Sequence, residues 1–181
     1  MNGIELSRLP PSGKIFCTLF LAGIGLGALA AFAQASTAVG ISPAAVQSSL
    51  SPEMPMTRVR HGEMSAEKEI DLGEISDEAK VWIRTPLLIQ TSHTHLFSQT
   101  LIAGLLGLIF LGTSVHDRLK GAVVALPFVG TWLDIGGMWL TRFASPSLSI
   151  LVVAGGTLFA LGYLFIAAIS LRDLWLRKET P

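Results

Sequence analysis

Four long apolar segments constrain the fold of this chain more than any other feature. They occupy residues 15–35, 96–115, 121–141 and 148–171. A run of about 20 apolar residues is long enough to cross the hydrocarbon core of a bilayer as an α-helix. Backbone groups in lipid have to bond within the segment, which favours helices. The sequence therefore predicts an all-α integral membrane protein with four transmembrane helices.

The composition supports a membrane protein and excludes several other classes. Charged residues make up 14 % of the chain, against roughly 25 % in soluble domains. The net charge of zero gives no reason to expect nucleic acid as a partner. A single cysteine, Cys17, excludes an internal disulfide. Motifs for covalent c-type haem, for nucleotide-binding loops and for zinc proteolysis are absent from the sequence.

The first apolar segment has two interpretations. Lys14 precedes it, and residues 31–33 and 33–35 read Ala-Phe-Ala and Ala-Gln-Ala, which fits a signal peptide with a cleavage site. The apolar stretch is longer than the roughly 7–15 residues of a signal core, which favours an uncleaved anchor. Cleavage would leave three membrane helices, and the loop that follows is exported in either case.

Basic residues predict the orientation in the membrane, since they concentrate in cytoplasmic loops. Those on one side of the predicted helices are Arg8, Lys14, Arg118, Lys120, Arg172, Arg177 and Lys178. The connection between the third and fourth segments carries only Arg142. The pattern predicts cytoplasmic N- and C-termini and an external region at residues 36–90, which would be periplasmic in a bacterial inner membrane.

Three regions follow from this arrangement: an anchor or signal segment at 1–35, an external linker and acidic loop at 36–90, and a three-helix membrane domain with a cytoplasmic tail at 91–181. The short connections 116–121 and 143–147 predict antiparallel neighbours and a compact three-helix unit. We expect Ser145 to cap the last helix, with Pro146 in its first turn.

The sequence predicts little regular structure in the external region. Residues 36–57 are rich in Ser, Ala and Pro and indicate a flexible linker. Ser76 is a candidate N-cap for one short helix, which would place Trp82 near the membrane surface. His116 is expected to cap the end of the second membrane helix as a cation.

Glycines in the three C-terminal segments predict close helix packing. These residues are Gly104, Gly107, Gly112, Gly130, Gly136, Gly137, Gly155, Gly156 and Gly162. Gly156 and Ala160 also form a small-xxx-small pair. Pro127 should kink the third segment because it frees a backbone carbonyl.

Polar residues near the second segment carry most of the functional signal. If residues 86–115 form one helix, Ser92, His95 and Gln99 share one face and His93 lies roughly opposite. Both histidines could reach a common metal only if the helix began near Thr94. Otherwise the two imidazoles serve different partners.

Asp134 lies inside the third segment, where an ionisable group costs roughly 2.5–3.5 kcal/mol. It should therefore face the helix bundle. Counting inward from the external side places Asp134 near the level of Gln99, with His95 one turn further out. Met138 lies on the same face, and Arg142 should close the mouth of this cluster.

Four chemical interpretations of this cluster remain open. An imidazole with a carboxylate suits copper, zinc or iron. Histidine and methionine ligate haem, and intramembrane Asp and His form proton relays. Alternatively, the polar groups only bond one helix to the next, at about 0.6 kcal/mol each.

Two sequence motifs, Ser-His-Thr-His-Leu-Phe at 92–97 and Asp-Ile-Gly-Gly-Met-Trp-Leu-Thr at 134–141, carry a resemblance. The chain resembles a group of small, uncharacterised bacterial inner-membrane proteins over residues 82–175. More distantly, the His-x-His is similar to a helix opening in relatives of haem–copper oxidases. That likeness implies a metal or haem, but the other histidines of those sites are absent from this chain.

The leading function predicted from the sequence is an accessory subunit of a redox or respiratory membrane system. It would bind a metal ion or haem at its outer face through His93, His95 and Asp134, supported by Gln99, Met138 and Arg142. The alternatives are a structural or assembly factor without cofactor, and a small proton-coupled transporter component that uses Asp134. Expected partners are the lipid bilayer, other membrane redox subunits and a second copy of the chain.

Overall fold

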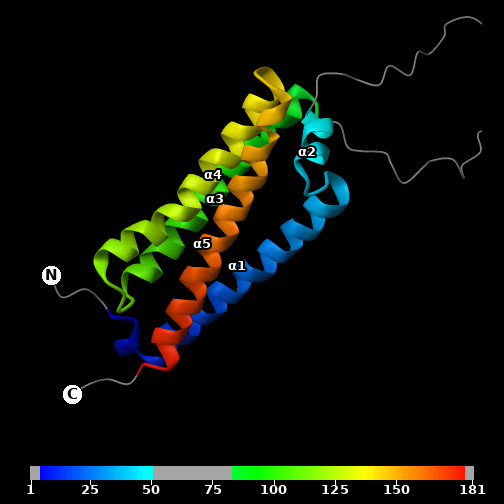
Figure 1. Ribbon diagram of the computed structural model, residues 1–181. Helices are drawn as coiled ribbons and strands as arrows, with labels where there is room; N and C mark the ends of the chain where they lie inside the picture. The colour runs from blue at the N-terminus through cyan, green and yellow to red at the C-terminus, as the bar shows by residue number, and fades with distance from the viewer. Residues whose placement is uncertain (1–4, 51–82, 178–181) are drawn as a thin grey trace, which may run out of the picture.

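The computed structural model describes residues 5–50 and 83–177, and this part of the chain is helical with no strand (Figure 1). The helices are η1 (Leu6–Arg8), α1 (Pro11–Ala38), α2 (Pro43–Leu50), α3 (Thr85–Leu111), α4 (Asp117–Phe143), η3 (Pro146–Leu148) and α5 (Ser149–Trp175). Among them α1, α3, α4 and α5 are long and apolar enough to cross a membrane. This confirms the predicted all-α fold with four candidate spans.

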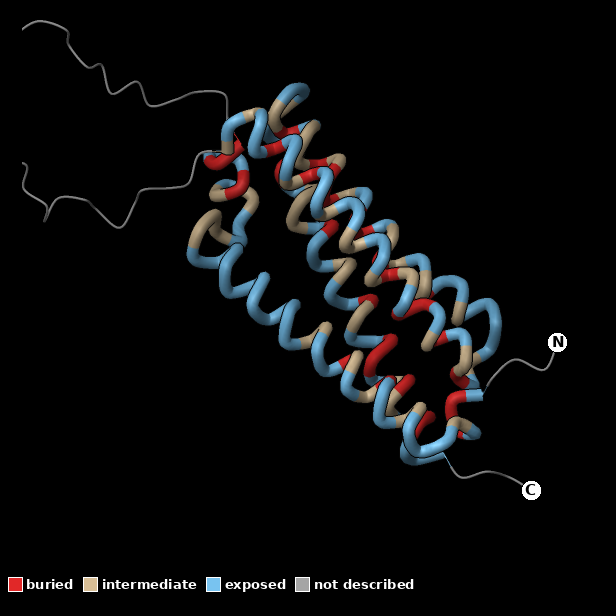
Figure 2. Tube along the Cα trace, turned by 180° about the vertical axis from the view of Figure 1, so that it is seen from behind, coloured by how far each residue is buried: buried red, intermediate tan, exposed pale blue. Residues whose placement is uncertain are grey.

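The membrane helices run nearly parallel or antiparallel to one another, and two ends can be defined (Figure 1). We call the end at which both chain termini lie the terminal end. The opposite end, which carries α2 and the connection from α4 to α5, is called the loop end. Helix α1 starts beside the end of α5 and moves away from it toward the loop end (Figures 1 and 2).

Helix α3 starts much earlier than its apolar run. It begins at Thr85, with Pro86 in the first turn, rather than at residue 96. Proline is favoured there because its missing N–H would have no helical partner. The predicted boundary between residues 90 and 91 therefore falls inside a helix.

His116 begins a helix instead of ending one. It is the N-cap of α4, and its Nδ1 accepts a hydrogen bond from the backbone N–H of Arg118 at 3.3 Å. The prediction that His116 caps the end of the preceding helix is wrong, because α3 already ends at Leu111 and His116 precedes the first residue of α4.

The connection from α4 to α5 is nearly as predicted. Ser145 is the N-cap of η3 and Pro146 follows it, but the Ser145 side chain makes no capping hydrogen bond. Its Oγ lies 2.8 Å from Oγ of Ser147 instead. Helix α5 itself begins at Ser149 with Leu148 as its N-cap, so the prediction that Ser145 caps the last membrane helix is wrong: Ser145 precedes a short 3-10 helix that leads into it.

Helices α4 and α5 make the closest contact in the bundle, and glycine makes it possible. A Cβ added at Gly130 would lie 2.6 Å from the backbone N of Phe159, and one at Gly162 would lie 2.8 Å from Cδ of Pro127. Gly137 and Gly155 are equally enclosed. The backbones approach so closely that no side chain fits between them.

Other predicted packing glycines have open space around them. A Cβ at Gly104, Gly136 or Gly156 would meet nothing within 4 Å, and Ala160 is exposed. The small-xxx-small pair of Gly156 and Ala160 therefore makes no close contact within this chain. These residues lie on helix faces that turn away from the neighbouring helix.

Helix α1 joins the bundle through its first half only. Leu21 is buried with Leu106, Phe110 and Ile166. The hydroxyl of Tyr163 donates to the carbonyl oxygen of Leu21 at 2.8 Å. Beyond residue 25 the helix is exposed almost to its end (Figure 2).

Part of the predicted flexible linker is a packed helix. Val46 and Leu50 of α2 are four residues apart, so they share one helix face. Both are buried with Leu88 against the loop end of α4 and α5. The linker prediction for 36–57 is therefore wrong for residues 43–50. The helix predicted to start at Ser76, together with Trp82, lies outside the described residues.

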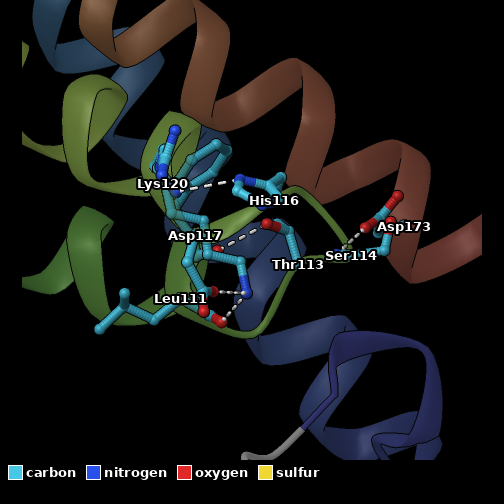
Figure 3. Close-up of polar contacts among 9 residues, drawn as sticks. Leu111, Thr113, Ser114, His116, Asp117, Lys120 and Asp173 are labelled. Carbon is cyan, nitrogen blue, oxygen red and sulfur yellow. Dashed lines mark hydrogen bonds and ion pairs between the residues drawn. The ribbon is translucent and has the colours of Figure 1, made fainter.

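The terminal end is held by polar contacts around the turn between α3 and α4 (Figure 3). The backbone N–H of Ser114 donates to Oδ2 of Asp173 at 2.6 Å, and Asp173 is only 1 % exposed. Nζ of Lys120 donates to the carbonyl oxygen of Leu111 at 2.9 Å. The N–H of Leu6 donates to the carbonyl oxygen of Gly112 at 2.8 Å, which attaches η1 to the same turn.

Candidate functional site

The face of α3 that looks into the bundle carries the polar stripe expected from the sequence. Ser92 is buried, and His95 and Gln99 are partly buried. His93 is exposed. Because α3 is already helical from Thr85, a step of two residues turns the side chain by about 200°. The structure therefore does not bring His93 to the face of His95.

Asp134 of α4 meets this stripe at the predicted level. It is 9 % exposed, and its carboxyl group interacts with the His95 imidazole and the Gln99 amide. Nε2 of Gln99 lies 3.5 Å from Nδ1 of His95. We call these three residues, His95, Gln99 and Asp134, the polar cluster.

One atom of the polar cluster has no partner. Oε1 of Gln99 is buried and makes no hydrogen bond within the described part of the chain. Exchanging the oxygen and nitrogen of the amide would leave a donor unpaired in place of an acceptor. In either assignment the cluster retains one unused hydrogen-bonding position.

A second polar contact joins the same two helices one turn closer to the loop end. Nε1 of Trp139 donates to Oγ of Ser92 at 2.8 Å, and the Trp139 ring stacks on Phe143 with centroids 5.5 Å apart. Helical periodicity predicts that Ser92 lies on this face, but Trp139 was not predicted as its partner. The signal was present, because a buried indole N–H usually finds an acceptor.

The predicted supporting residues have other partners. Nη1 of Arg142 donates to the carbonyl oxygens of Leu50 at 3.0 Å and Ile83 at 3.3 Å. Arg142 therefore connects α4 to the end of α2 and to Ile83, two residues before the start of α3. Met138 packs on the apolar cluster of α2. Both residues stabilise the loop end.

The polar cluster lies within the membrane-spanning length of the helices. Asp134 is 17 residues from Asp117, the first residue of α4, which corresponds to about 26 Å. His93 is 18 residues from Leu111, the last residue of α3, or about 27 Å. Against a hydrocarbon thickness of about 30 Å, both residues lie near the boundary at the loop end, His93 on the exposed side of α3 and Asp134 inside the bundle.

The donors of the cluster do not form a complete metal site by themselves. No group of three or more His, Cys, Asp or Glu side chains is close enough to hold a metal within residues 5–50 and 83–177. The cluster offers one imidazole and one carboxyl group, whereas a zinc site takes at least three protein ligands. Its geometry suits hydrogen bonding between helices.

The fold defines a multi-pass helical membrane protein. Residues 80–181, more than half of the chain, match Aq_1264_TM, a family described as a transmembrane helical domain. The chain therefore belongs to the Aq_1264_TM family, and the match spans α3, α4 and α5. No curated protein and no solved structure matches the chain.

Proposed function

We propose that this protein is an accessory subunit that supports a membrane assembly structurally and holds no cofactor on its own. The proposal depends on one observation: polar side chains of α3 and α4 bond to one another across the contact between the two helices. Ser92 bonds to Trp139, and the polar cluster connects the same two helices. Such bonds fix helix orientation in lipid, where an unpaired polar group is unfavourable.

The packing of α4 on α5 favours a structural role for this protein over a role in transport. Their backbones meet at Gly130 and Gly155 without room for a side chain. A substrate path between these two helices would require them to separate. The proposal therefore gives Asp134 a role in joining α3 to α4.

Purification in detergent tests this function. The full chain should show no Soret band and no stoichiometric copper, zinc or iron, and His95→Ala should leave the absorption spectrum unchanged. Asp134→Asn retains a hydrogen-bonding side chain and should remain folded, whereas Asp134→Ala should unfold at a lower temperature. A stoichiometric metal or haem that is lost in His95→Ala would overturn the proposal.

A second candidate is the redox subunit, with a metal ion or haem shared between this chain and another. Two observations favour it: His93 is exposed near the membrane boundary, and Gln99 Oε1 has no partner in the described residues. Metal or haem that appears only in the assembled complex, and is lost in His93→Ala, would support it. A cofactor-free complex would contradict it.

We also propose that the terminal end faces the cytoplasm of a bacterial inner membrane. The terminal end carries Arg8, Lys14, Arg118, Lys120, Arg172 and Arg177, while the loop end carries Arg84 and Arg142 among the described residues. Basic residues favour the cytoplasmic side. A fluorescent protein fused after Pro181 should fluoresce, and alkaline phosphatase fused there should be inactive. The reverse pattern would contradict this orientation.

A further inference from the structure

The start of α1 and the end of α5 form a joined surface at the terminal end. Nε1 of Trp175 donates to Oγ1 of Thr18 at 3.0 Å. That hydroxyl in turn donates to the carbonyl oxygen of Lys14 at 2.8 Å. Because α1 and α5 run in opposite directions (Figure 1), Lys14 and Arg177 both lie beyond this contact on the terminal side.

The terminal end has an excess of positive charge. Its described acidic residues are Glu5, Asp117 and Asp173, and each pairs with one basic residue: Arg8 at 3.3 Å, Lys120 at 3.8 Å and Arg172 at 3.0 Å. Six basic residues minus these three leaves Lys14, Arg118 and Arg177. Within the described residues these three have no carboxylate partner, and two of them flank the Thr18–Trp175 contact.

Apolar surface lies directly next to these two cations. Ile15 and Leu19 of α1, which share the helix face beside Lys14, are 51 % and 67 % exposed, and Trp175 is 55 % exposed. Trp is favoured at the interface between headgroups and hydrocarbon. The surface therefore changes from cationic to apolar within about two helical turns.

We propose that this surface binds an anionic phospholipid, with the phosphate between Lys14 and Arg177 and an acyl chain along Ile15 and Leu19. Clusters of Lys and Arg at a helix end recognise anionic headgroups. The adjoining apolar side chains favour a lipid over a free phosphate ion, since an ion would leave them without a partner. Trp175, held by Thr18, forms the wall of the site on α5.

Native mass spectrometry of the full chain in detergent tests the site, with phosphatidylglycerol as the probe. Lys14→Gln and Arg177→Gln should each weaken phosphatidylglycerol binding about fivefold, and the double variant about 25-fold, since each basic residue near a lipid headgroup contributes about one such factor. Phosphatidylethanolamine has the same phosphate but an ammonium group that cancels its charge, so it should bind more weakly to the unaltered chain and should respond less to both substitutions.

Arg118→Gln is the matched control. It removes the same charge at the same end, from a residue that is also exposed but lies in the first turn of α4. Its phosphatidylglycerol affinity should equal that of the unaltered chain. Equal weakening in all three variants, or displacement of the lipid by inorganic phosphate, would overturn the site. Thermal unfolding of each variant separates lost binding from lost folding.

Discussion

At the residue scale, polar side chains decide how α3 meets α4. Ser92, His95 and Gln99 occupy one face of α3, and Asp134 and Trp139 approach them from α4. In water such contacts compete with solvent, whereas in a bilayer core the alternative is an unsatisfied group. The polar stripe therefore sets the rotation of α3 about its axis.

The bond between Ser92 and Trp139 should be measurable by a double-mutant cycle. Ser92→Ala and Trp139→Phe each remove one partner of a 2.8 Å hydrogen bond. We expect a coupling energy of about 0.6 kcal/mol, the average for such bonds in membrane helices. Unfolding in mixed micelles measures it. Additive effects of the two substitutions would show that the bond contributes nothing to stability.

Asp173 offers a second test at this scale. Asp173→Ala removes the buried carboxylate that accepts the N–H of Ser114, which should cost about 1.5–3 kcal/mol, as for other hydrogen bonds to charged groups. Asp173→Asn keeps an acceptor oxygen and should cost less. Asp117→Ala is the control, because that side chain is 97 % exposed and its loss should leave unfolding unchanged. If Asp117→Ala destabilises the protein as much as Asp173→Ala does, the Ser114 contact is not the cause.

That His95, Gln99 and Asp134 face one another could be predicted from the sequence. Helical periodicity and the cost of a carboxyl group in lipid can both be judged from the sequence of a single helix. The partner of Arg142 could not. Its acceptors, the carbonyl oxygens of Leu50 and Ile83, are backbone atoms that any sequence provides. Their position depends on where α2 packs, which is a tertiary property.

At the element scale, helix existence was predictable and helix ends were not. Hydropathy identifies the apolar core of each span, but α3 continues through polar residues back to Thr85. The short helix α2 was missed because its apolar face consists mainly of Val46 and Leu50. Val46 and Leu50 are buried only because α2 packs against the loop end of the bundle.

The sequence also does not show which glycines lie in a helix contact and which face open space. Two neighbouring glycines of α5 provide a matched pair of substitutions that tests the difference. Gly155→Ala would place a methyl group against the backbone of Asp134 and should destabilise the protein by about 1–3 kcal/mol. Gly156→Ala meets open space and should be neutral or stabilising, since alanine favours helices over glycine by about 1 kcal/mol. Thermal unfolding in detergent measures both. Equal effects of the two substitutions would contradict the observed rotation of α5.

At the scale of the whole molecule, the spans differ in how firmly they are attached. Helices α4 and α5 are fixed along their length by glycine contacts, and α3 is joined to α4 by polar bonds. Helix α1 is attached by Leu21 and Tyr163 near the terminal end and by α2 at the other. Between these two attachments α1 is exposed (Figure 2).

Arg142 should govern the stability of the loop end as a unit. Arg142→Gln removes donors from the carbonyl oxygens of Leu50 and Ile83. Hydrogen exchange should accelerate in α2 and in the first turns of α3, while α5 near Asp173 keeps its protection. Arg118→Gln should change neither region. Faster exchange throughout the molecule after Arg142→Gln would show that the residue stabilises the entire bundle.

The contacts around Arg142 also indicate where this chain can accept an inserted sequence. The N–H of Ile83 donates to the carbonyl oxygen of Ser49 at 3.0 Å, so these two residues, which lie on either side of residues 51–82 in the sequence, are held next to each other. An insertion between Ser49 and Ile83 should not alter the spacing of the membrane helices. The two ends of the inserted segment would be held next to each other, and lengthening a chain between fixed ends costs little entropy. A foreign domain whose own ends lie close together could be grafted there, and the membrane-embedded portion would still assemble.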